Sequence, residues 1–491
     1  MKKNYVLFWT LLFFCQCALF SQDGTLDPSF GNGNGYVITD FTSSEDQCYA
    51  VIEQADGKIV AFGYADYGEN QSLSRYLPDG SLDASFGVDG KVKNDFNCEG
   101  GFIFYGSINE QDDGKLVTGS THRLPGGASD IFLTRHLLNG ELDTDFGVNG
   151  TVRTNHGIDM LSATSVLPDG KIIASGWSQI GSSRYLLLAK YLTDGTPDTS
   201  FGDDGIVATY LHESSTIVFR FQIQNDGSIL VAFRGASGFL TFHRYLADGT
   251  LDSNFGTAGV VVTNIASSLL YGSIAIKENG AIVAVMRLGN NNIVLAQFLA
   301  DGSPDLSFGT NGITTLNIPH DVPVDMLLDQ NENILISGND FGFEISDYFL
   351  IRYDTNGVLD TSFGQGGVTR LGFESHSISL QKDGKILLAG GTYWYSGPVD
   401  FVVIRIRNGN LGISEGEQQN FKVSPNPSKN VFTIKNTAYF NRVPYQISDA
   451  FGKIIQTGNF EGTENKLDLS GASNGLYFLH VSNTSIKLLK N

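Results

Sequence analysis

The fold is decided by the stretch Leu82-Asp83-Ala84-Ser85-Phe86-Gly87-Val88-Asp89-Gly90, which recurs with small changes along most of the chain. Its Phe-Gly pairs are spaced by 53 to 60 residues and begin at Phe30, Phe86, Phe146, Phe201, Phe255, Phe308 and Phe363. A period of this length indicates a tandem array of one supersecondary unit. The chain is therefore expected to be a repeat protein.

Within each repeat, short runs of β-branched and aromatic residues alternate with tight-turn sequences. In the first unit these runs are residues 36–41, 48–54, 58–64 and 73–77, and Asp56-Gly57 forms a hairpin turn between the second and the third. Four antiparallel strands in each of seven units predict an all-β fold, a seven-bladed β-propeller, because β-helix repeats are much shorter.

The recurring motif is interpreted as the connector from one blade to the next. Its Asp can cap a single turn, its Phe can fill the space between blades, and its Gly can end the turn with a φ that other residues rarely adopt. We expect a structural role for all of these residues, with a catalytic or calcium-binding role for the Asp residues as the alternative. The Asp positions are Asp27, Asp83, Asp143, Asp198, Asp252, Asp305 and Asp360.

The fourth strand of most repeats carries a cation on its apolar face. A buried cation needs a partner, and the connector Asp is predicted to be that partner. The cations are Arg75, Arg135, Lys190, Arg244, Arg352 and Arg405, with Gln297 as the exception.

The first residues have the features of a secretory signal peptide, which we assign to residues 1–21. Lys2 and Lys3 precede an apolar run over residues 6–14, and small or polar residues follow it. The run is too short to span a bilayer permanently, and no later stretch is long and apolar enough to do so. Cys15 and Cys17 lack the small neighbours that a lipoprotein signal requires. The chain is therefore expected to leave the cytoplasm with no membrane span.

The formal net charge of −20 argues against nucleic acid and anionic membranes as partners, because both require a basic surface. Such a charge either keeps a large exported protein soluble or attracts cations.

The connector, the repeat length and the Arg-Tyr-Leu strand before it together resemble the delta-60 repeats of bacterial secreted proteins. The resemblance covers residues 23 to about 406 and implies a propeller scaffold without an established reaction. We assign residues 22–407 to the propeller.

Beyond residue 407 the repeat stops. Residues 408–420 read as a polar linker, and residues 421–491 contain seven strand-like runs, enough for a small β-sandwich. The runs Ser424-Pro425-Asn426-Pro427-Ser428, Asp449-Ala450-Phe451-Gly452-Lys453 and Asn474-Gly475-Leu476-Tyr477-Phe478 resemble the C-terminal sorting domain of the type IX secretion system. The resemblance implies a Bacteroidetes-type bacterium, the type IX machinery as a partner of residues 421–491, and a secreted or cell-surface location. A sandwich that binds a ligand is the alternative.

The sequence predicts no catalytic residues, no metal ligands and no cofactor. It has no Gly-x-Ser-x-Gly, His-Glu-x-x-His, phosphate-loop or Cys-x-x-Cys motif, and His136 and His243 are expected to be packed or surface residues of their strands. The variable loops opposite the connectors are where a repeat scaffold keeps its binding residues. Aromatic side chains expected there, as platforms for a glycan or a protein or else as buried anchors, are Trp177, Phe341, Phe343, Tyr393, Trp394 and Tyr395.

These features favour a binding scaffold over an enzyme. The alternative function is a polysaccharide-degrading enzyme with its site in the propeller channel, which would require two or more carboxylates converging on that channel.

The cysteines that remain after signal removal are Cys48 and Cys98. An exported protein can oxidise its thiols, so we expect a disulfide between adjacent blades, with two unpaired buried thiols as the alternative.

Overall fold

The computed structural model describes residues 23–491 except for positions 43, 97–103, 125, 212–216, 267–271, 289–291, 317–320, 341–346, 393–397, 410–420, 425, 450–452 and 482–483. The signal peptide predicted for residues 1–21 therefore lies outside the described residues. The chain divides into two compact units, Met1–Asn408 and Gly409–Asn491. In the part of the chain that the structure describes, no helix has the length and apolar character needed to cross a membrane.

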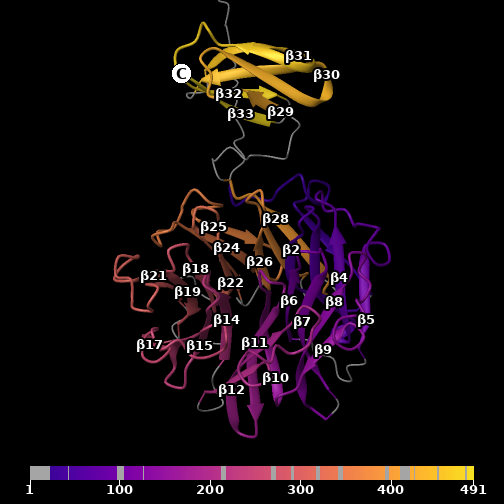
Figure 1. The fold of residues 1–491 in the computed structure, drawn as a ribbon, viewed down its shortest axis with the longest axis vertical. Coiled ribbons are helices and arrows are strands. Elements are labelled where there is room, and N and C mark those ends of the chain that lie inside the picture. The colour runs from indigo at the N-terminus through magenta and orange to yellow at the C-terminus, as the bar shows by residue number, and fades with distance from the viewer. Residues whose placement is uncertain are drawn as a thin grey trace, which may run out of the picture. The chain divides into compact units, whose positions relative to one another are not determined.

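The first unit is a seven-bladed β-propeller built from seven four-stranded antiparallel sheets (Figure 1). The first strands of the blades contact one another in ring order, so they form the inner wall of the propeller. Blade 1 contains β2 (Gln47–Glu53), β3 (Ile59–Ala65), β4 (Asn70–Tyr76) and β5 (Lys91–Asp95). The corresponding strands of the other blades are β6 (Phe104–Glu110), β7 (Leu116–Arg123), β8 (Ser129–His136), β9 (Thr151–Thr154); β10 (Ile158–Val166), β11 (Ile172–Ile180), β12 (Ser183–Tyr191), β13 (Ile206–Tyr210); β14 (Ile217–Ile223), β15 (Ile229–Arg234), β16 (Phe239–Tyr245), β17 (Val260–Ala266); β18 (Gly272–Ile276), β19 (Ile282–Arg287), β20 (Ile293–Phe298), β21 (Ile313–Leu316); β22 (Asp321–Leu328), β23 (Ile334–Asp340), β24 (Asp347–Tyr353), β25 (Val368–Leu371); and, in blade 7, β26 (Ser377–Leu380), β27 (Ile386–Gly391) and β28 (Phe401–Ile406).

The strand that opens the first repeat completes the last blade. β1 (Tyr36–Thr39) pairs antiparallel with β28, with Tyr36 opposite Ile404 and Thr39 opposite Phe401. The expectation that this strand begins the first blade is wrong: each blade takes three strands from one repeat and its outer strand from the next. Because a strand from the first repeat and three strands from the last repeat share one sheet, the ring is closed and no gap separates the first and last blades.

The recurring connector lies within a blade, between its third and fourth strands, and not between blades as expected. Its Phe nevertheless fills the space between neighbouring blades, because Phe86 packs in a cluster that includes Leu73 of blade 1 and Ile108 of blade 2. A Cβ on Gly140 of blade 2 would lie 2.9 Å from the Phe86 ring, so only glycine allows this approach. All seven Phe side chains of the motif are at most 1% exposed.

The connector Asp organises its own turn and holds the predicted cation, which lies on the fourth strand of the repeat and thus on the third strand of the blade. In all seven connectors its Oδ1 accepts the backbone N–H two residues ahead. In five blades the Arg Nε donates to the Asp Oδ2 at 2.8 Å, in the pairs Arg75–Asp83, Arg135–Asp143, Arg244–Asp252, Arg352–Asp360 and Arg405–Asp27. In blade 3 the Ser200 hydroxyl and the Lys171 ammonium lower the pKa of Asp198 to about 2.

The same cation also joins its blade to the next. Arg75 donates from Nη1 to the carbonyl oxygen of Leu138, in the turn after the third strand of blade 2, at 2.6 Å. Its guanidinium lies 4.4 Å from the centroid of the Phe86 ring. Each cation therefore makes an ion pair, a hydrogen bond to the neighbouring blade and a cation–π contact at once. We call this arrangement of Asp, cation and Phe the clamp.

Blade 5 forms its clamp with a cation from a different strand. Gln297 replaces the Arg and donates to Asp305 at 2.7 Å, but no guanidinium reaches the next blade from this position. Lys277, the residue after β18, donates from Nζ to the carbonyl oxygen of Thr355 in blade 6, and this Nζ lies 5.6 Å from the Phe308 ring centroid. The two tasks of one Arg are thus divided between Gln297 and Lys277.

The C-terminal unit is a single five-stranded sheet that curls over its own core. Its strands are β29 (Phe421–Ser424), β30 (Val431–Asp449), β31 (Ile454–Asp468), β32 (Gly475–Val481) and β33 (Thr484–Lys490). The predicted sandwich takes this form because β30 and β31 each span two of the expected short strands. The start of β30 pairs with β29 and its end with β32, so side chains from both halves, such as Phe432 and Ile447, share one cluster.

Candidate functional site

The two ends of the blades form two faces with different content. The connector face contains the turns between the first and second strands and the connectors between the third and fourth. The loop face contains the turns between the second and third strands and the segments that run from one blade to the next. The aromatic residues predicted for binding were expected on the loop face.

Trp177 had been expected in a loop, but it lies within strand β11. It is half-buried against a cluster that contains Leu186 and Phe221. The guanidinium of Arg184 lies 4.2 Å from its ring centroid, so this cation covers part of the indole. A ligand-binding role for Trp177 stays a prediction.

The other predicted aromatic residues, Phe341, Phe343, Tyr393, Trp394 and Tyr395, lie outside the described residues. In the sequence, the last three fall between β27 and β28, in the segment that ends at Asp400.

Cys48 is a free, buried thiol on β2, and burial raises its pKa to about 12. The structure shows no disulfide at Cys48. Its predicted partner, Cys98, lies outside the described residues. Of the two alternatives, packed or surface, the structure shows His136 and His243 buried, and burial lowers the pKa of each to about 4.

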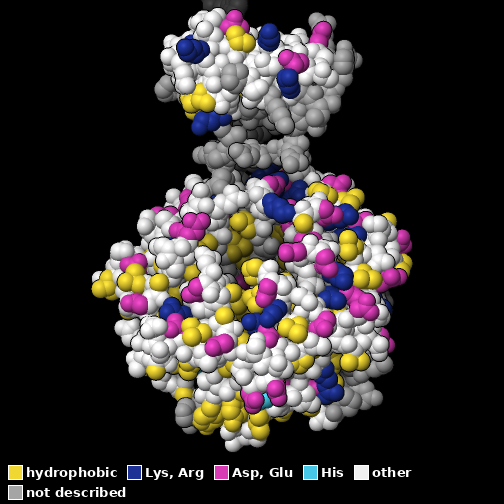
Figure 2. All heavy atoms as spheres, viewed as in Figure 1, with side chains coloured by type: hydrophobic (Ala, Val, Ile, Leu, Met, Phe, Trp, Pro, Cys, Tyr) yellow, Lys and Arg dark blue, Asp and Glu magenta, His cyan; other side chains and the backbone are white. Residues whose placement is uncertain are grey.

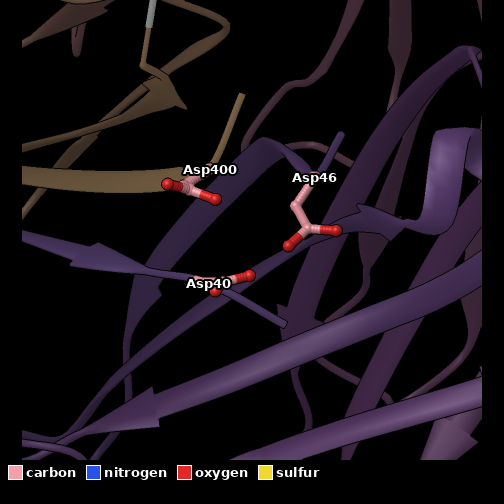
Figure 3. Close-up of side chains that lie close together, drawn as sticks. All are labelled: Asp40, Asp46 and Asp400. Atoms are coloured by element: carbon pink, nitrogen blue, oxygen red, sulfur yellow. The ribbon is translucent and has the colours of Figure 1, made fainter. Parts of the chain in front are cut away.

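Three carboxylates meet on the loop face where blade 7 closes against blade 1. They belong to Asp40 after β1, Asp46 before β2 and Asp400 before β28, and one oxygen of each lies within 4.8 Å of the others. Figure 3 shows the three carboxyl groups facing a common space. Grouped carboxylates can accept hydrogen bonds from ligand hydroxyls or supply oxygen ligands to a hard cation.

Asp46 also holds its own loop together. Its Oδ2 accepts the backbone N–H groups of Phe41, at 2.8 Å, and Thr42, at 3.3 Å, while its Oδ1 accepts that of Asp66. Burial raises the pKa of Asp46 to about 6, despite these bonds. Burial and the nearby Asp40 also raise the pKa of Asp400. The cluster therefore binds protons more readily than exposed carboxylates do.

Aromatic rings lie on the same junction. The Tyr49 ring contacts the ring of His376 from blade 7, with centroids 4.9 Å apart, and that of Tyr64, with centroids 5.4 Å apart. The hydroxyls of Tyr49 and Tyr64 both donate to Gln47 Oε1. Tyr49 and His376 are each half-buried. The junction thus combines acceptor oxygens with partly exposed ring surface.

Sequence reasoning missed this junction, since Asp40 and Asp400 are far apart in the chain. They meet because Thr39 pairs with Phe401, which places the residues beside that pair together. Recognising that β1 belongs to the last blade would have revealed the contact.

A charged pair bridges the central channel, where Figure 2 shows the propeller hollowed. Arg220 on β14 of blade 4 lies 3.2 Å from Asp325 on β22 of blade 6. Ser273 on β18 of blade 5 also donates to Asp325, at 3.1 Å. This carboxylate is therefore neutralised by a cation, whereas the enzyme alternative requires a pair of carboxylates directed at a substrate.

Family comparisons match both units. Residues 422–491 match the model of a secretion system C-terminal sorting domain. Residues 54–86, 167–201, 283–308, 333–363 and 381–409 match a domain of unknown function, DUF5122, described as a beta-propeller.

Three of the solved structures that match this chain share little sequence with it. A polysaccharide lyase, Uly1, shares 10% identity with a TM-score of 0.45, covering 80% of this chain and 94% of the lyase. A protein of unknown function from Dyadobacter fermentans DSM 18053 shares 12% identity with a TM-score of 0.42, covering 76% of this chain and 98% of that one. BBS1N, solved in complex with ARL6DN, shares 12% identity with a TM-score of 0.41, covering 78% and 96% respectively. Comparison with curated proteins found no match.

A C-terminal sorting domain of this kind directs export through the type IX secretion system, to the cell surface or outside the cell. The chain thus contains DUF5122 β-propeller repeats, of the delta-60-like family, and a C-terminal type IX secretion sorting domain.

Proposed function

We propose that the exported propeller is a binding scaffold, and that it holds a hydroxyl-rich ligand of the glycan class at the junction of blades 7 and 1. The observation that supports this most is the meeting of Asp40, Asp46 and Asp400 at a junction that also holds the Tyr49 and His376 rings. Carboxylates accept hydrogen bonds from sugar hydroxyls, and aromatic rings stack on the apolar faces of sugars.

The surrounding architecture supports a rigid platform. The clamps fix neighbouring blades to each other on the connector face, so the ligand would meet loops held at defined positions. Such pre-organisation limits the entropy lost on binding.

A glycan array probed with the full mature chain tests the proposal. We expect binding to a restricted set of glycans, weakened about tenfold by Asp40→Asn, which removes an exposed charge from the junction. Asp89→Asn is the matched control, because Asp89 is exposed on the connector face and has a φ of 52° that Asn tolerates well. Equal effects of the two variants would contradict a site at the junction. Depolymerisation of a bound polysaccharide would favour the enzyme alternative.

The C-terminal unit would serve export alone. Deleting residues 421–491 should leave a folded propeller in the periplasm, because the two units are separately compact. Cell fractionation checks this expectation. Normal surface display of the truncated chain would contradict it.

A further inference from the structure

Blade 3 ends on the loop face in a long hairpin, and exposed aromatic rings lie beside it. Its strands β10, β11 and β12 have nine residues each, more than any other described strand of the propeller. Figure 2 shows hydrophobic side chains gathered at the lower end of the propeller, where Figure 1 places these strands. We propose that the junction of blades 2 and 3 is a second glycan site, in which sugar rings stack on Tyr185 and Tyr210. This inference rests on the proposed function, because it assigns the same class of ligand to another junction.

The first argument is the open ring surface. Tyr185 and Tyr210 are paired across β12 and β13, and their ring centroids lie 5.6 Å apart. Tyr210 is 46% exposed and Tyr185 is half-buried. Ile180 is also exposed, and it pairs with Ser183, so the alternation of side chains along the strands places it on the same face as the two rings. This face of blade 3 therefore offers aromatic surface to a ligand.

The two rings are turned toward the segment that joins blade 2 to blade 3. The ring of His156, which belongs to this segment, meets Tyr185 edge-on, with the centroids 6.1 Å apart. His156 Nδ1 shares a hydrogen bond of 3.2 Å with Ser178 Oγ, and Ser178 pairs with Tyr185 across the hairpin. A third aromatic side chain is thus fixed at the same junction.

The second argument is a loop that this junction shares with the junction of blades 7 and 1. There Asp46 Oδ2 accepts the backbone N–H of the residue after Asp40, at 2.8 Å. Between blades 2 and 3, Asp159 Oδ2 accepts the backbone N–H of the residue after Asn155, at 2.7 Å. Asp40 and Asn155 are both exposed, and either side chain can hydrogen-bond to a sugar hydroxyl. The same kind of loop therefore presents a polar group to the ligand at both junctions.

The two junctions would hold a sugar by different contacts. Between blades 2 and 3 the carboxylates of Asp130 and Asp159 are buried, and Arg153 forms an ion pair with Asp130. Among the described residues of this junction, these two carboxylates are thus closed to a ligand. Recognition there would depend on stacking against the rings and on the amide of Asn155, whereas the other junction would depend on its carboxylates.

Affinity electrophoresis of the full mature chain in gels that contain laminarin, xylan or polygalacturonate tests the proposal. We expect retardation in at least one of these gels, and an apparent Kd that Tyr210→Ala raises about tenfold. Tyr210→Phe keeps the ring and should bind as the wild type does. Val262→Ala is the matched control, because Val262 is 59% exposed on the outer strand of blade 4. It should leave the retardation unchanged.

Asn155→Ala provides a second test if Tyr210→Ala fails to fold, and it should weaken binding several-fold. Comparison with Asp40→Asn separates the two junctions. A loss in Tyr210→Ala without a loss in Asp40→Asn would support the second site and remove the first. A loss in Asp40→Asn alone would overturn the second site and keep the proposed function. Retardation in none of the gels, or equal losses in Tyr210→Phe and Tyr210→Ala, would overturn stacking on these rings and favour a protein partner.

Discussion

The connector face and the loop face are two ends of the same seven blades, yet they satisfy their polar groups differently. On the connector face, the same Asp, cation and Phe meet in each blade, and even blade 5 restores the contacts with Lys277. On the loop face, the described residues bring three carboxylates together only at Asp40, Asp46 and Asp400, and burial keeps the pKa of Asp46 raised. Asp130 and Asp159 hold the places of Asp400 and Asp46 between blades 2 and 3, but Asn155 stands there in place of Asp40. Repetition thus marks the groups that hold the ring together, and departures from repetition mark the candidate site.

The largest expected effect comes from breaking a clamp. Arg75→Met should reduce the free energy of unfolding of the propeller by about 3 kcal/mol, because it leaves the 6%-exposed Asp83 without its guanidinium. Urea denaturation of the mature chain measures the change.

The matched control breaks an ion pair on the loop face. Lys93 pairs with Asp66 at 2.9 Å, but its side chain is 44% exposed. Lys93→Met should therefore cost less than about 1 kcal/mol. Similar losses in the two variants would show that the connector face has no special role in stability.

An intermediate effect is expected from moving the cation of blade 5 back to the usual strand. Lys277→Gln should destabilise the propeller by about 1–2 kcal/mol, because the Thr355 carbonyl and the Phe308 ring lose their cation. The double variant with Gln297→Arg should recover most of this loss, since the new guanidinium can reach Asp305 and blade 6 together. A double-mutant cycle from urea denaturation gives the coupling. Strictly additive effects would show that the two positions do not share one task.

The smallest effect concerns the pH dependence of the loop face. The folded pKa of Asp46, about 6, exceeds the ordinary value of 3.8, so its protonation favours the folded state. This contribution is fully present below the ordinary value and is lost as the pH rises through 6. Relative to Asp46→Asn, the wild type should therefore gain melting temperature as the pH falls from 7.5 to 5.

Comparison with the variant is needed because buried histidines act in the opposite direction. Burial lowers the pKa of His122, His136 and His243 to about 4, so their contribution to stability is lost as the pH falls below 6.5. The difference between wild type and Asp46→Asn cancels this background. A difference that does not change with pH would contradict the raised pKa of Asp46.

The fold was predictable from local patterns, while its closure was not. Asp56-Gly57 and its equivalents fix hairpins between adjacent runs, and the Arg75–Asp83 spacing repeats, so strands and clamps follow from short-range rules. Nothing local distinguishes a strand that pairs with its sequence neighbour from one that pairs with the far end of the array. The same long-range step placed Asp40 beside Asp400. The transfer of a cation to Lys277 also escaped prediction, because it depends on which side chains share a groove.

Closure of the ring by β1 is the claim on which both faces depend. The Arg405–Asp27 clamp and the Asp40–Asp400 contact exist only if this strand completes blade 7. The direct test is a cross-link in a mature chain whose native cysteines are replaced by serine. Ile38 pairs with Val402, so Ile38→Cys with Val402→Cys should form a disulfide that joins the two peptides in mass spectrometry. A disulfide in the alternative pair, Ile38→Cys with Ile52→Cys, and none in the first would place the strand in blade 1 and contradict the account.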